Sequence, residues 1–245
     1  MKQHKTLFLL FLRHTAWKVL LILAGSAVIQ AALFRFLMPD PTRYSLETVL
    51  QNTESWLWWV VLLTFAVMVG LLLSASTVRG KGRTDYLLDR LAVPPGEVIL
   101  CQGICNTLAI LLFWAVEALV LLGLCRMYGA MGGFLGPQTI FLATWQNDLL
   151  HSFLPMEEVS RWVRNLCWCL GVGFAAAAGS AQLRRKGKAI GIFFLIGLSG
   201  SVFRCPMGNL DLDLLYSLST LGIAAVTLHN AFTMRKEGDY EEETS

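Results

Sequence analysis

Six apolar segments, most of them about 20 residues long, constrain this chain more than any other feature of its sequence. About 20 apolar residues in a helix cross the roughly 30 Å hydrocarbon core of a bilayer. Only 15% of the 245 residues are charged, whereas a soluble domain carries about 25%, so we expect the surface to face lipid. The predicted membrane-spanning segments are 15–38, 56–78, 98–128, 162–183, 189–203 and 210–233.

The distribution of lysine and arginine predicts how these segments are oriented. Fourteen of the 20 basic residues, including every lysine, fall on the side that holds both ends of the chain and the 79–97 and 184–188 loops. The positive-inside rule makes that side cytoplasmic. We therefore predict an all-α integral membrane protein with six transmembrane helices and both termini in the cytoplasm. The first apolar segment is expected to be a retained signal anchor, since no clear cleavage site follows it.

Two parts of this topology stay open from the sequence. The fifth segment is short, so it is either a full crossing or a re-entrant element. Between the third and fourth segments, apolar residues at helical spacing over 139–153 predict an amphipathic helix along the outer interface. Residues 1–236 form one predicted domain, followed by a mobile acidic cytoplasmic tail at 237–245.

The six cysteines form no CxxC pair, and most are expected to be packing residues. Cys125 and Cys205 both fall near the predicted outer face, so a disulfide between them stays open as an alternative. The four histidines are scattered, and the sequence contains neither a GxxxxGK[ST] phosphate loop nor an HExxH motif. The sequence therefore predicts no catalytic residue, no metal ligand and no cofactor in this chain, and the net charge of +3 gives no argument for nucleic acid.

The most informative stretch is the loop at 79–102, which has the sequence RGKGRTDYLLDRLAVPPGEVILCQ. It begins basic, continues as a short amphipathic helix over 85–91, and is broken by Pro94-Pro95-Gly96 before Glu97 opens the third apolar segment. From periodicity alone, this helix is an ordinary loop helix that rests on the lipid headgroups.

This loop resembles the corresponding loop of the ABC-2 type permeases of ATP-binding-cassette transporters, and the six-segment arrangement with both ends inside is similar to theirs. The resemblance implies that the loop carries a coupling helix, which docks on a separate ATPase subunit that binds Mg-ATP. This chain departs from the family pattern at Pro95, where that family often has a basic or serine residue. The matching residues are Asp85, Tyr86, Leu87, Leu88, Asp89, Arg90, Leu91, Val93, Pro94, Gly96 and Glu97.

Glu117 is the one acidic residue in the middle of an apolar segment, where an ionisable group costs about 2.5–3.5 kcal/mol on insertion scales. We expect it to face a substrate path or a subunit contact, or else to be a hydrogen-bonded packing residue. Gln30 is a second, weaker candidate for the same role. The small residues of 171–180 are expected to allow close helix packing.

The resemblance implies a multi-pass permease subunit in the cell membrane that exports a peptide, a lipid-like molecule or an antibiotic. It would work with ATPase subunits and a second, identical or homologous permease half, surrounded by membrane lipid, and would not itself be an enzyme. The alternative is a membrane scaffold or accessory subunit that moves no solute. An intramembrane lipid enzyme is a third class, but the sequence lacks the clustered acids or histidines that it needs.

Overall fold

The structure is a computed structural model that describes residues 2–38, 40–41, 43–74, 94–134, 136, 138–156, 158–184, 187–205 and 209–243. Every regular element in these ranges is an α-helix. The helices are α1 (Lys2–Leu37), α2 (Leu46–Ser74), α4 (Pro95–Ala130), α5 (Thr139–Gln146), α6 (Asp148–Phe153), α7 (Val159–Arg184), α8 (Ile190–Val202) and α9 (Leu210–Glu243).

Prolines and short polar side chains account for several of the helix ends. α1 ends two residues before Pro39, because a residue that precedes proline is held away from helical geometry. Pro95 begins α4, at the first helical position where its missing N–H costs no hydrogen bond. Asn209 caps α9, since its Oδ1 accepts a hydrogen bond from the Leu212 amide at 3.3 Å.

Five helices are long and apolar enough to cross a membrane by length and composition. The apolar stretches are Phe11–Leu37, Leu46–Ser74, Gly96–Ala130, Val159–Arg184 and Leu210–Thr233. α8, which corresponds to the predicted fifth segment, has 13 residues and is only about 20 Å long. A sixth crossing therefore stays a prediction, while the all-helical fold is confirmed.

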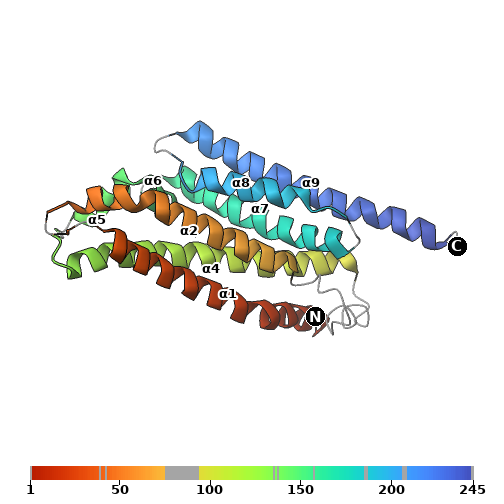
Figure 1. The fold of residues 1–245 in the computed structure, drawn as a ribbon. Helices are drawn as coiled ribbons and strands as arrows, with labels where there is room; N and C mark the ends of the chain where they lie inside the picture. The colour runs from red at the N-terminus through yellow and green to blue at the C-terminus, as the bar shows by residue number, and fades with distance from the viewer. Residues whose placement is uncertain are drawn as a thin grey trace.

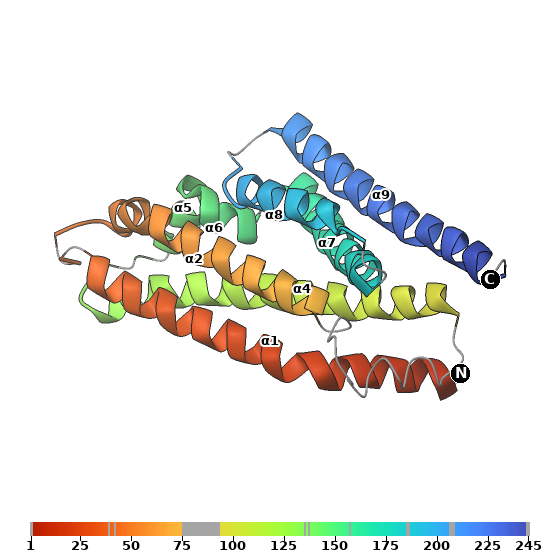
Figure 2. The same cartoon turned by 45° about the vertical axis from the view of Figure 1, so that its right-hand side comes forward.

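The long helices pack side by side as an elongated bundle (Figure 1). The N- and C-termini lie at the same end of this bundle, which we call the terminal end, and α5 and α6 lie at the opposite end. An even number of passes requires this placement of the termini, but which side of the membrane the terminal end faces stays a prediction. Figure 2 shows α8 between α2 and α9, with α1 and α9 on opposite sides of the bundle.

α7 is the central helix, and it packs most extensively against α9 and α4. Its small residues allow this approach. A Cβ added at Gly171 would lie 2.5 Å from Thr220 Cγ2 of α9, and one at Gly173 would lie 2.6 Å from the Thr107 backbone nitrogen of α4. The expectation that the 171–180 stretch serves close helix packing is therefore confirmed.

The core also contains an aromatic cluster with ring centroids 5.1–6.4 Å apart, formed by side chains of α2, α4, α6, α7 and the C-terminal end of α8. Its members are Phe65, Phe113, Phe153, Trp168 and Phe203. Aromatic pairs at these separations stabilise a fold beyond the area that they bury.

Large apolar side chains are exposed along the outer faces of all the long helices, as on α1 (Trp17 and Val28), α4 (Leu119) and α9 (Leu218). A monomeric soluble protein rarely exposes contiguous apolar surface on this scale. Together with the five long apolar helices, this surface defines the chain as a multi-pass membrane protein.

The 139–153 segment differs from the single amphipathic helix that its spacing predicts. It forms α5 and α6, which are separated at Asn147, because that residue is extended (φ −107°, ψ 115°) and its side chain caps α6. Asn147 Oδ1 accepts a hydrogen bond from the Leu150 amide at 2.9 Å. Leu149 to Phe153 are all buried, so α6 packs into the end of the bundle.

At the C-terminus, α9 continues to Glu243 and so includes most of the predicted acidic tail at 237–245.

Candidate functional site

Glu117 lies in a buried polar cluster between α1, α2 and α4. Gln30 Nε2 lies 2.6 Å from one carboxylate oxygen, Glu117 Oε2, and Ser26 Oγ donates a hydrogen bond to the other oxygen, Oε1, at 3.1 Å. Gln30 Nε2 also lies 2.9 Å from Ser26 Oγ, and Thr64 Oγ1 lies 2.9 Å from that same oxygen. We call Ser26, Gln30, Thr64 and Glu117 the Glu117 cluster.

The cluster joins the two residues that the sequence singled out separately. Ser26 and Thr64 were missed, although Ser26 stands one helical turn before Gln30 and so shares its face of α1. No sequence signal places Thr64 there, because its contact with Ser26 joins residues on different helices.

The Glu117 and Gln30 side chains are completely buried, so neither reaches the surface of this chain. Two donors for the Glu117 carboxylate offset part of the cost of placing it at this depth. Gln30 Oε1, by contrast, is buried without a hydrogen-bond partner. A buried polar cluster with an unused acceptor is sensitive to any rotation of α1 against α4, because rotation would change which donors meet which acceptors.

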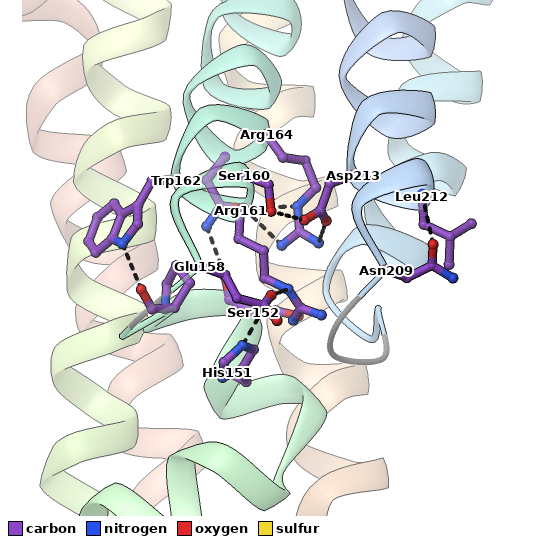
Figure 3. Close-up of polar contacts among 12 residues, drawn as sticks. His151, Ser152, Glu158, Ser160, Arg161, Trp162, Arg164, Asn209, Leu212 and Asp213 are labelled. Carbon is purple, nitrogen blue, oxygen red and sulfur yellow. Dashed lines mark hydrogen bonds and ion pairs between the residues drawn. The ribbon is translucent and has the colours of Figure 1, made fainter.

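A second buried polar group lies at the α5–α6 end of the bundle, and Figure 3 shows its arrangement. Glu158 lies between two basic side chains: Arg161 Nε is 2.5 Å and His151 Nε2 is 3.4 Å from Glu158 Oε2. Arg161 is fully buried, and its partner Glu158 is only partly exposed. This group connects α6 to the start of α7.

Next to it, Arg164 of α7 pairs with Asp213 of α9, with Nη1 3.0 Å from Oδ1 (Figure 3). Ser160 Oγ donates to the other oxygen, Asp213 Oδ2, at 2.7 Å, and both charged side chains are buried. We call Glu158, Arg161, Arg164 and Asp213 the charged network. It contains two cations and two anions, so the network as a whole is close to neutral at pH 7.

Arg161 and Arg164 of the charged network are two of the basic residues that the charge distribution assigns to the outer side. Both are almost inaccessible to solvent. Their side chains are buried because each has a carboxylate partner, which sequence periodicity does not reveal.

The titration of two groups at this end follows from their burial. Burial lowers the pKa of His151 from its ordinary value of 6.5, and the nearby Arg161 guanidinium lowers it further, while Glu158 acts in the opposite direction. Burial raises the pKa of the Cys205 thiol. Cys125 and Cys205 are both free cysteines in this structure.

The segment that carries the family resemblance lies mostly outside the described residues, which resume at Pro94 after Ser74. Its described part is the start of α4, where the Glu97 amide donates to the Pro94 carbonyl oxygen at 2.9 Å. A Cβ added at Gly96 would lie 3.6 Å from Phe232 of α9, so α4 starts against the last helix. Outside the described residues are Asp85, Tyr86, Leu87, Leu88, Asp89, Arg90, Leu91 and Val93.

Within the described ranges, no group of three or more His, Cys, Asp or Glu side chains is arranged to hold a metal ion. No protein-family model matches the chain, and no curated protein or solved structure matches it either. The class of protein therefore rests on the fold alone: a helical, multi-pass membrane protein.

Proposed function

We propose that this chain is the permease subunit of an ATP-binding-cassette transporter of the ABC-2 type, located in the cell membrane, and that it acts as an exporter. The observation that carries the proposal is the 79–97 sequence in its topological position. α2 runs toward the terminal end of the bundle and α4 starts from it, so both helix ends that flank this sequence lie at the end that also holds both termini (Figure 1).

In this proposal, Leu87, Leu88 and Leu91 are the apolar anchors of a coupling helix, and Asp85, Asp89 and Arg90 set its register on the partner. ATP is hydrolysed in the partner ATPase. Movement of the loop would reach the bundle through α4, since the loop connects directly to Pro95. Glu117 lies on the same helix, and its cluster links α4 to α1 and α2. A shift of α4 would therefore change the hydrogen bonds of the Glu117 cluster.

The test is purification of the full chain from its native membrane, with mass-spectrometric identification of bound ATPases and a measurement of ATP hydrolysis. Leu87→Asp combined with Leu88→Asp is expected to remove an ATP-binding-cassette ATPase from the preparation while membrane insertion is unchanged. The matched control is Gly80→Asp combined with Gly82→Asp, which also adds two acids to the same loop but leaves the anchors and the basic residues intact.

Two results separate the proposal from its alternatives. Unchanged ATPase binding in the Leu87/Leu88 variant would refute the coupling helix. Binding of an ATPase whose turnover never responds to any exported cargo would favour an accessory subunit that moves no solute.

A further inference from the structure

A groove of about 610 Å³ opens on the surface of the bundle between α8 and α9. Its walls are apolar, and Ile190, Phe194 and Val226 are exposed along them. Val226 lies in the apolar stretch Leu210–Thr233 of α9, and α8 is a shorter apolar helix, so we expect the groove to open toward lipid.

The groove exists because several of the residues that line it have small side chains or none. Gly191 of α8 and Gly222 of α9 line it, together with Ser219. A Cβ added at Gly222 would meet no atom within 4 Å, so the space above this glycine is open. At Gly191 the same addition would lie 2.3 Å from Thr227 Oγ1, so this glycine instead allows α8 and α9 to approach each other at the base of the groove.

One end of the groove is polar and carries a positive charge. Lys188 and Asn230 are exposed there, at the α7–α8 connection and on α9 respectively. This is the terminal end of the bundle, on the side to which every lysine of the chain is assigned by the sequence. The groove is thus mostly apolar, with one basic end at Lys188.

We propose that this groove binds one anionic phospholipid of the bilayer, with an acyl chain between α8 and α9 and its phosphate at Lys188. The acyl chain alone gives the groove little affinity for a lipid, because the chain moves from one apolar environment, the bilayer, into another. Selectivity therefore comes from the charge complementarity between Lys188 and the phosphate, as in basic pockets between transmembrane helices at the cytoplasmic side. The proposal does not depend on a transport function.

The experiment uses the full chain, reconstituted in vesicles of phosphatidylcholine and phosphatidylglycerol, extracted in mild detergent and analysed by native mass spectrometry. The wild-type chain is expected to retain phosphatidylglycerol in preference to phosphatidylcholine. Lys188→Gln should lower this preference about fivefold, as expected for one lysine near the membrane surface. Gly222→Leu should fill the groove and abolish retention of both lipids.

Two matched controls separate the groove from general effects. Lys18→Gln removes another lysine of the same predicted side, and Gly123→Leu adds the same side chain at a lipid-exposed glycine of α4 that also has open space around it. Both should retain lipid as the wild-type chain does. If Gly222→Leu fails to fold by circular dichroism, Ser219→Leu, also in the groove, takes its place.

The proposal is overturned if Lys188→Gln leaves the lipid preference unchanged, or if the folded groove-filling variant retains as much lipid as the wild-type chain. It is also overturned if the spectra show a dimer that the groove variants abolish, since the occupant would then be a second copy of this chain.

Discussion

Gln30 Nε2 lies 2.6 Å from Glu117 Oε2, across the interface between α1 and α4. Both side chains are fully buried, so this contact lies inside the bundle. Hydrogen bonds between transmembrane helices contribute about 0.6 kcal/mol on average and up to about 1.7 kcal/mol. The contact is therefore one of several that hold α1 against the rest of the bundle.

A double-mutant cycle tests this relationship. Gln30→Leu and Glu117→Leu should each lower the free energy of unfolding, whereas the double variant should lose less than the sum, because neither polar partner is then left alone. We expect a coupling energy of about 0.5–2 kcal/mol from chemical unfolding in detergent. Glu117→Gln, which keeps the acceptor oxygen, should be milder than Glu117→Leu. Strict additivity of the two single effects would contradict the contact.

The pair between Arg164 and Asp213 should be sensitive to loss of one partner. Asp213→Leu leaves the Arg164 guanidinium buried without its carboxylate, which is expected to cost about 3–5 kcal/mol. The control is Asp40→Leu, since the Asp40–Arg43 pair is largely exposed and should change stability by less than about 1 kcal/mol. Equal effects of the two substitutions on thermal unfolding would be inconsistent with a buried pair.

His151 makes the stability of the α5–α6 end depend on pH. Its pKa in the folded chain lies below 6.5, mainly because of burial. The unfolded chain therefore binds a proton at His151 as the pH falls below about 6.5 while the folded chain does not. Stability is retained above that pH and lost below it. His151→Gln should weaken this loss in unfolding experiments across pH, and His229→Gln, at an exposed position on α9, should not.

Two glycines should respond in opposite directions to the same substitution. Gly173→Ala places a Cβ 2.3 Å from Thr107 Oγ1 and 2.6 Å from its backbone nitrogen, so α7 and α4 must separate and stability should fall. Gly123→Ala meets no atom within 4 Å, so it should stabilise its helix by about 0.5–1 kcal/mol. Melting temperatures of the two variants in the same detergent give the comparison.

The topology of α8 is tested with reporter fusions. If α8 crosses the membrane, a reporter inserted after Lys188 and one fused at the C-terminus should both be cytoplasmic, and one inserted after Cys205 should be on the outer side. If α8 is re-entrant, the reporters after Lys188 and Cys205 should lie on the same side. The lysine distribution predicts the first result.

Much of the fold could be predicted because it depends on local properties of the chain. Apolar length alone located the six long or apolar helices, but three of them extend well beyond the predicted segments: α1 starts at Lys2, α2 starts at Leu46, and α9 continues to Glu243. The short fifth segment was also recognised, and it forms the 13-residue α8. The break at Asn147 was not predicted, since periodicity continues through 139–153 and only the capping side chain interrupts it.

The candidate sites depended far more on tertiary structure. The sequence singled out Glu117 and Gln30 as polar residues in apolar segments, but they are 87 residues apart, and nothing local indicates that they meet. The same holds for Arg164 and Asp213, which are 49 residues apart. The sequence alone determined that the chain is helical and apolar, and how its lysines are distributed, because hydropathy and charge belong to individual residues. Only the tertiary structure decided which buried polar groups are paired, because pairing depends on how each helix is rotated about its axis and packed against its neighbours.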